Sequence, residues 1–133
     1  MKATVITDAS WCPNTKAAGW AAWVKADGYP SRGFSGVVQQ LCKSSNEAEI
    51  IAAAAGVGVA FRAYGATRIL IQSDCDVVGR EVWKHLPEDV RLNCAVRYKH
   101  VKGHTEIDDK RSWANRWCDE HAKIAMKHLR VLL

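Results

Sequence analysis

Four acidic residues in separate parts of the chain are the residues best suited to chemistry. Asp8 and Asp74 each follow an apolar run, Glu49 lies early in an Ala-rich segment, and Asp119 lies near the C-terminus. If two strand ends and two helices bring them to one edge of a sheet, the carboxylates will raise one another's pKa unless a cation is present. Oxygen ligands suit Mg²⁺ or Mn²⁺ better than zinc, and two such ions promote in-line attack on a phosphodiester. The four acids therefore point to metal-dependent cleavage of nucleic acid.

Each of these acids, taken alone, has a more ordinary interpretation. Asp8 is typical of a turn residue, and Asp74 could equally cap the helix that follows it. Glu49 alone would be a solvated helix acid, although its surroundings are apolar. Asp119 alone is typical of a surface ion pair. The joint order and spacing of the four favours the metal interpretation.

The composition is that of one small globular domain. A chain of 133 residues is long enough for a core, and we expect a single domain over residues 1–133. Hydrophobic residues make up 48% and charged residues 25%, both ordinary for a soluble protein. The formal net charge of +5 favours a polyanionic partner. No apolar run is long enough for a signal peptide or a membrane span, so we expect a cytoplasmic protein without membrane contact.

The cysteines are scattered and odd in number, and none forms a C-x-x-C pair. This pattern argues against a zinc knuckle or a disulfide framework. We expect reduced thiols that pack as small apolar groups in a cytosolic compartment. The five cysteines are Cys12, Cys42, Cys75, Cys94 and Cys118.

Hydrophobic periodicity and turn signals predict eight elements. Ser44 and Glu47 form a capping box at the start of the first helix, and Gly65 is its expected end. The predicted order is βββαβαβα, an α/β fold in which helices flank a mixed five-stranded sheet of three antiparallel strands followed by parallel ones. We expect Trp20, Trp23 and Trp83 in the core. Strands are predicted at 2–8, 18–25, 31–39, 68–73 and 96–101, and helices at 44–64, 76–86 and 112–129.

Four short motifs contain the acids. They are Ile6-Thr7-Asp8-Ala9-Ser10, Ser45-Asn46-Glu47-Ala48-Glu49-Ile50, Ile71-Gln72-Ser73-Asp74-Cys75, and Val101-Lys102-Gly103-His104 with Asn115-Arg116-Trp117-Cys118-Asp119. In this order they resemble the T-D-G-S, T-N-N-x-x-E-L, T-D-S and V-K-G-H…N-x-x-x-D motifs of the type 1 ribonuclease H family. The resemblance spans almost the whole chain and implies the ribonuclease H-like fold.

The resemblance also implies an activity. The chain would be an endonuclease that hydrolyses the RNA strand of RNA–DNA hybrids and leaves 5′-phosphate and 3′-hydroxyl ends. Asp8, Glu49, Asp74 and Asp119 would hold two Mg²⁺ ions, with Mn²⁺ as an alternative. Glu49 is chosen over Glu47 because Glu47 has a structural role at the helix cap. His104 matches the histidine thought to assist proton transfer or product departure.

Substrate contacts are expected from small polar side chains near the acids and from one lysine. The residues are Ser10, Asn14, Ser45, Asn46 and Lys102. Contacts to 2′-hydroxyl groups would distinguish RNA from DNA, and a phosphate contact would position the duplex without reading its sequence. Ser45 and Asp76 depart from the Asn and Gln that are usual in the family at these positions. The short stretch after Asp74 resembles the compact form that lacks an extra helix and basic loop.

Alternative functions remain open from the sequence. The chain could be a nuclease of the same fold that acts on DNA or double-stranded RNA, or a ribonuclease H-like module that binds nucleic acid without cleaving it. A fragment of a reverse transcriptase or integrase is less favoured, because Met1 directly precedes the first strand and a helix closes the chain. We expect a monomer without an obligate protein partner.

Overall fold

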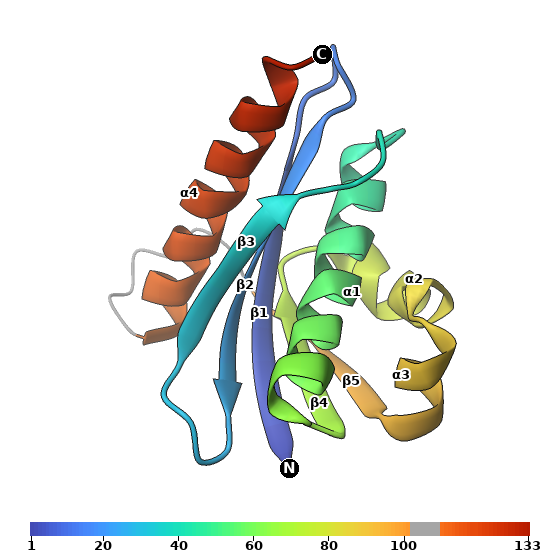
Figure 1. Ribbon diagram of the computed structural model, residues 1–133, viewed down its shortest axis with the longest axis vertical. Coiled ribbons are helices and arrows are strands. Elements are labelled where there is room, and N and C mark those ends of the chain that lie inside the picture. The colour runs from blue at the N-terminus through green and yellow to red at the C-terminus, as the bar shows by residue number, and fades with distance from the viewer. Residues whose placement is uncertain (102–109) are drawn as a thin grey trace.

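The computed structural model describes residues 1–101 and 110–133. Its described part contains five strands and four helices (Figure 1). The strands are β1 (Lys2–Trp11), β2 (Ala18–Ala26), β3 (Arg32–Val37), β4 (Arg68–Ser73) and β5 (Ala95–His100). The helices are α1 (Ser45–Tyr64), α2 (Asp76–His85), α3 (Glu88–Asn93) and α4 (Lys110–Arg130).

The strands form one mixed sheet in the order β3-β2-β1-β4-β5. The pairs β1–β2 and β2–β3 are antiparallel, whereas β1–β4 and β4–β5 are parallel. α1 and α4 lie on opposite sides of this sheet (Figure 1). The predicted fold class, with three antiparallel strands followed by parallel ones, is confirmed.

The two faces of β1 pack against different helices, because successive side chains of a strand point to opposite sides of the sheet. Val5 and Thr7 face α1, which approaches so closely that a Cβ on Gly56 would lie 2.7 Å from Val5 Cγ1. Ile6 faces the other way and packs with Ala114 and other buried residues of α4. Asp8 shares the face of Ile6, so the alternation directs its carboxylate away from the main core.

The ends of α1 follow the predicted signals closely. The Ser44 hydroxyl accepts a hydrogen bond from the Glu47 amide at 3.1 Å. The Glu47 carboxylate accepts from the Lys43 amide at 3.4 Å, one residue before the cap, so the capping box is offset by one residue. Gly65 ends the helix in the left-handed conformation with φ 74°.

Two details of the sequence prediction are wrong, and one open alternative is resolved. The structure contains a further short helix, α3, between α2 and β5. Pro87, predicted only to end α2, is also the N-cap residue of α3, and proline is common near the start of a helix. Trp83, expected in the core, is 46% exposed on α2. The N-cap residue of α2 is Cys75, so the alternative in which Asp74 caps this helix does not hold.

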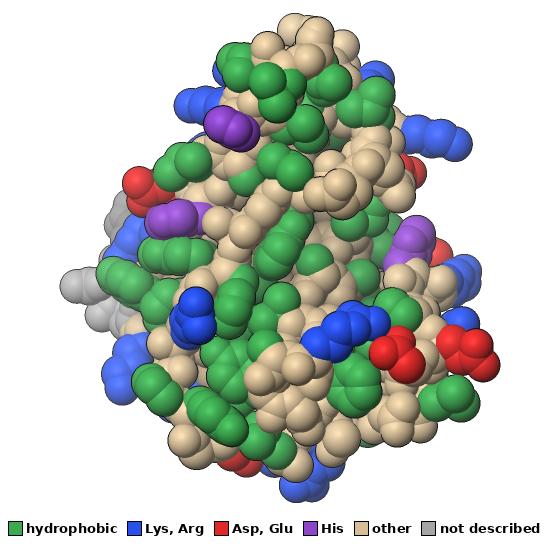
Figure 2. Space-filling model, in the orientation of Figure 1, with side chains coloured by type: hydrophobic (Ala, Val, Ile, Leu, Met, Phe, Trp, Pro, Cys, Tyr) green, Lys and Arg blue, Asp and Glu red, His purple; other side chains and the backbone are tan. Residues whose placement is uncertain are grey.

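The surface gives two further findings. On the face shown in Figure 2, which carries β3, hydrophobic side chains lie among scattered Lys and Arg, so the positive charge is not gathered in one patch there. Within the described residues, no helix combines the length and the apolar character that a membrane crossing requires.

Candidate metal centre

Three of the four predicted acids meet at one edge of the sheet. One carboxylate oxygen from each of Asp8, Glu49 and Asp74 lies within 4.8 Å of the other two. Asp74 directly follows β4, and Glu49 lies in the second turn of α1. Asp8 does not end its strand as predicted, because β1 continues to Trp11 with β2 as its partner.

The early end of the β1–β4 pairing creates room for this cluster. The last paired residues are Ile6 and Gln72, so Asp8 lies beyond the point where β4 leaves β1. Parallel neighbours end at the same edge of a sheet, which places Asp74 beside the continuing strand. The chain path therefore brings two acids together that are 66 positions apart in the sequence.

One backbone amide holds two of the carboxylates. The Ala9 N–H donates to Asp8 Oδ1 at 2.9 Å and lies 3.3 Å from Glu49 Oε1. The other oxygen of Glu49, Oε2, is buried and has no hydrogen-bond partner within residues 1–101 and 110–133. A buried acceptor without a partner is costly, and a cation bound there would satisfy it.

Burial and mutual repulsion raise the pKa of both partly buried acids. Burial, together with the charges of Asp8 and Asp74, raises the pKa of Glu49 to about 9. Burial, together with the charges of Asp74 and Asp119, raises the pKa of Asp8 to about 6. Three carboxylates that disfavour one another's charge, with oxygen as the only donor element, fit a hard divalent cation such as Mg²⁺ or Mn²⁺.

Asp119 lies near this cluster but has its own partner. Its carboxylate accepts from the Lys123 ammonium at 3.0 Å, one helical turn further along α4. The surface ion pair expected of Asp119 alone is therefore present. Its negative charge still contributes to the raised pKa of Asp8, so it remains a candidate fourth ligand.

The predicted substrate-binding residues divide into three groups. Ser45 and Asn46 line the same cavity of about 460 Å³ as Glu49 and Asp74. Ser10 lies two residues beyond Asp8 on β1, and Asn14 is exposed in the turn that follows β1. Lys102 and His104 lie outside the described residues, so their predicted roles stay predictions.

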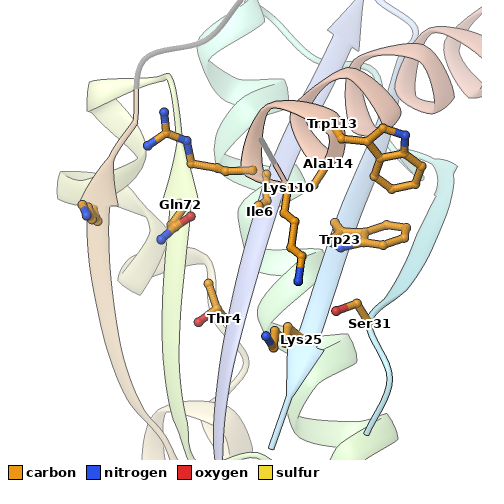
Figure 3. Close-up of a pocket in the computed structure, with 11 residues that line it drawn as sticks. Thr4, Ile6, Trp23, Lys25, Ser31, Gln72, Lys110, Trp113 and Ala114 are labelled. Atoms are coloured by element: carbon orange, nitrogen blue, oxygen red, sulfur yellow. The ribbon is translucent and has the colours of Figure 1, made fainter. Parts of the chain in front are cut away.

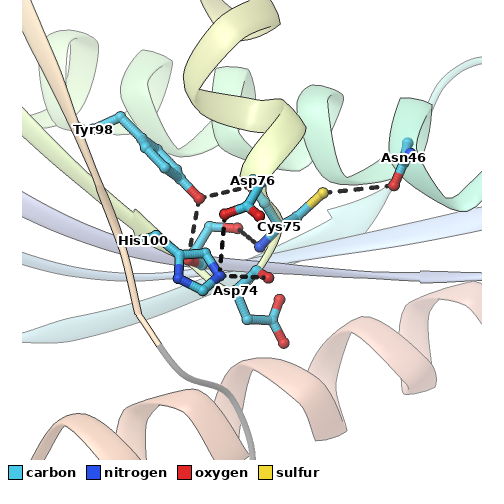
Figure 4. A network of polar contacts seen from close by, with 7 residues as sticks. Asn46, Asp74, Cys75, Asp76, Tyr98 and His100 are labelled. Carbon is cyan, nitrogen blue, oxygen red and sulfur yellow. Dashed lines mark hydrogen bonds and ion pairs between the residues drawn. The ribbon is translucent and has the colours of Figure 1, made fainter.

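A network of polar contacts supports the backbone around Asp74 (Figure 4). The Tyr98 hydroxyl lies 2.6 Å from the Cys75 carbonyl oxygen and donates to it. The Cys75 thiol lies 3.6 Å from Asn46 Oδ1 and connects this turn to α1. His100 Nε2 lies 3.2 Å from the Asp74 carbonyl oxygen and 3.3 Å from Asp76 Oδ1.

Sequence reasoning missed His100 and a neighbouring cation. None of the four motifs includes His100, although it is the last residue of β5, pairs with Ser73 and therefore lies next to Asp74. The predicted register of two parallel strands could have shown this. Arg80 of α2 also lines the cavity of the acids, and no motif drew attention to it.

Several solved structures that are similar to this chain are ribonucleases H. The chain matches RNase H1 from the halophilic archaeon Halobacterium salinarum NRC-1 with a TM-score of 0.70 and 13% identity, over 96% of this chain and 99% of that one. It matches LC11-RNase H1 in complex with an RNA/DNA hybrid with a TM-score of 0.68 and 11% identity, over 96% and 98%.

A third similar structure is the N-terminal RNase H domain of Rv2228c from Mycobacterium tuberculosis, solved as a fusion with maltose binding protein. Its TM-score is 0.64 and its identity 21%, over 96% of this chain and 94% of that one. No family model and no curated protein sequence matches the chain. At these identities the likeness concerns the fold, and the chain has the fold of type 1 ribonucleases H.

Proposed function

We propose that this chain is a metal-dependent endonuclease that hydrolyses the RNA strand of RNA–DNA hybrids and leaves 5′-phosphate and 3′-hydroxyl ends. The observation that carries the proposal is the cluster of Asp8, Glu49 and Asp74 within 4.8 Å, with a buried and unpartnered Glu49 Oε2 among the described residues. Such a cluster is unfavourable without a cation, and it lies in a fold shared with ribonucleases H.

The residues of the site would have distinct roles. Asp8, Glu49 and Asp74, with Asp119 from α4, would hold two divalent ions. When bound, such ions supply a nucleophilic hydroxide at neutral pH and stabilise the departing oxygen of a phosphodiester. The Ala9 amide orients the carboxylates of Asp8 and Glu49. His104 would assist proton transfer or product departure.

One of the similar structures supports an RNA–DNA hybrid as the substrate. LC11-RNase H1 was solved in complex with an RNA/DNA hybrid. In this chain Ser45 and Asn46 line the cavity of the acids, where they would contact the minor groove and the 2′-hydroxyl groups that mark RNA. Ser10 and Asn14 would extend this contact, and Lys102 would contact a phosphate.

One observation keeps a second substrate class open. Asp76, at a position where the family often has Gln, is paired with His100 and places a further negative charge beside the site. A changed contact to the duplex would favour DNA or double-stranded RNA as the substrate of the same acids. The control substrates below separate these cases.

The test is cleavage of a labelled RNA–DNA hybrid with Mg²⁺, with Mn²⁺ and with EDTA. Single-stranded RNA, double-stranded RNA and DNA serve as control substrates. We expect the RNA strand of the hybrid to be cut only with a metal, and Asp74→Asn to lower the rate by more than about a hundredfold, because ligands matter at least as much as the groups that orient them. Glu120→Gln, which removes an exposed acid of α4 next to Asp119, is the matched control.

The outcomes differ in meaning. No cleavage of any substrate with either metal would contradict the nuclease proposal and favour a binding module. Cleavage of DNA or double-stranded RNA instead of the hybrid would retain the nuclease and change its substrate. Equal loss of activity in Glu120→Gln and Asp74→Asn would remove the acids' assigned role.

A further inference from the structure

A second cavity lies on the sheet face that α4 only partly covers. α4 packs against β1, β2 and β3, so within residues 1–101 and 110–133 it leaves the β4–β5 half of this face uncovered. The cavity has a volume of about 1010 Å³, and none of its described lining residues lines the cavity of the acids. Its lining comes from β1, β2, β4, β5, the turn before β3 and the first turns of α4.

The lining is basic and aromatic. Its charged side chains are Lys25, Lys99, Lys110 and Arg111, and no Asp or Glu is among its described residues. None of these four cations forms an ion pair within the described part of the chain. Four cations around one cavity, with no acid among its described lining residues, give it a positive potential that favours an anionic ligand.

Flanking residues extend the charge across the open face. The strand register aligns Trp23, Ile6, Gln72 and Lys99 in one row across β2, β1, β4 and β5. The next row on the same face contains Lys25 and Arg97, because side chains two apart on a strand point the same way. One row spans three strand spacings, about 14 Å.

Arg111 and Lys110 lie at the N-terminal end of α4, where the helix dipole favours an anion. Both lie in the first turn of α4, which contains no acid. Cations are unfavourable at the positive end of a helix dipole, and an anion bound there would offset this. Arg111 Nε is also buried without a hydrogen-bond partner among the residues that the structure describes.

Two tryptophans form the apolar end of the cavity. Trp23 and Trp113 meet edge to face with ring centroids 4.9 Å apart. Trp113 remains 47% exposed although it is a large aromatic side chain. Figure 3 shows the two rings together at one end, Gln72 at the other, and the Lys110 side chain extending between them.

We propose that this cavity binds a single strand of nucleic acid, with a base stacked on Trp113 and phosphates on Lys25, Lys99 and Arg111. An aromatic platform beside a positively charged groove is the usual arrangement for binding single strands without sequence preference. Ile6 is two residues from Asp8 on the same face of β1, about 7 Å along the strand. A single-stranded end next to a bound duplex would therefore reach the cavity.

The test is the affinity for short fluorescein-labelled oligothymidylate and oligouridylate, measured by anisotropy in EDTA. Because EDTA removes divalent ions, the result does not depend on whether the acids cleave. We expect Trp113→Ala to weaken binding about tenfold and Trp113→Phe to restore most of it. Trp83→Ala is the matched control, since Trp83 is equally exposed at 46% on α2.

Charge is tested with two double variants of equal net charge. Lys25→Glu with Lys99→Glu should weaken binding about tenfold at low salt and reduce its salt dependence. Arg91→Glu with Lys127→Glu makes the same change of −4, from +5 to +1, on exposed residues outside the cavity. Circular dichroism of every variant shows whether it folds.

Several results would overturn the proposal. Equal weakening by both double variants would mean that only the overall charge matters. Unchanged binding in folded Trp113→Ala would remove the stacking platform. Competition by polyglutamate as strong as that by unlabelled oligothymidylate would indicate a site for acidic peptides instead.

Discussion

The carboxylate of Glu49 has one oxygen near the Ala9 amide and one buried without a partner in the described residues. Burial and the charges of Asp8 and Asp74 raise its pKa to about 9. The same features that make the group unfavourable alone make it a good ligand for a divalent cation. Glu47, two residues earlier, instead accepts hydrogen bonds from the Gln40 side chain and the Lys43 amide.

This contrast predicts metal binding that can be measured without substrate. Mg²⁺ at ten times its dissociation constant should stabilise the folded protein by about 1.4 kcal/mol, because a ligand that binds only the folded state shifts the unfolding equilibrium. Asp74→Asn should lose most of this shift in a thermal melt. Glu120→Gln should keep it, and a full Mg²⁺ shift in Asp74→Asn would contradict the assigned site.

At the scale of elements, α1 is the part that fixes Glu49 relative to Asp8. The helix approaches β1 at Gly56, where a Cβ would lie 2.7 Å from Val5 Cγ1 and 2.8 Å from Thr7 Cγ2. Both neighbours belong to the central strand and are buried. A larger residue at this position would push α1, and with it Glu49, away from the sheet.

Two glycines of α1 therefore predict opposite effects. Gly56→Ala should lower the free energy of unfolding by about 1–3 kcal/mol, the usual effect of overpacking. Gly58→Ala should be neutral or raise it by up to about 1 kcal/mol, because alanine favours the helix and its Cβ meets only the far end of the long Arg62 side chain. Urea unfolding measures both, and similar destabilisation by the two substitutions would refute the close approach.

At the scale of the whole molecule, the raised pKa values make metal-free stability depend on pH. A folded state that holds protons more tightly than the unfolded chain loses stability as pH rises. For these acids the loss begins near their ordinary values of 3.8 and 4.5 and continues through about 6 for Asp8 and about 9 for Glu49. A bound cation would oppose this loss.

Glu49→Gln isolates this dependence. In EDTA, the variant should gain stability over the unmodified protein as pH rises from about 5 to about 8, because glutamine carries no charge to bury. Glu47→Gln, at a half-buried acid in the preceding turn of the same helix, is the control and should show no such gain. A stability difference that is equal at both pH values would contradict the proposed burial of the Glu49 charge.

The sequence by itself determined the order of the elements and the identity of the candidate acids. Both are local properties: strand alternation, the Ser44 cap, the Gly65 stop and short motifs require only neighbouring residues. The same local reasoning missed α3 and misplaced Trp83, because the surroundings of α2 depend on distant segments.

Only the tertiary structure decided which groups meet. Asp8 lies in the part of β1 that continues beyond its pairing with β4. Asp119 forms an ion pair with Lys123, and His100 lies beside Asp74. Among the described residues the tertiary structure also left half of one sheet face uncovered by α4, with cations from three elements around the cavity there. Burial, pKa and cavity shape arise from contacts between residues far apart in the chain, and such contacts are fixed only when the helices pack on the sheet.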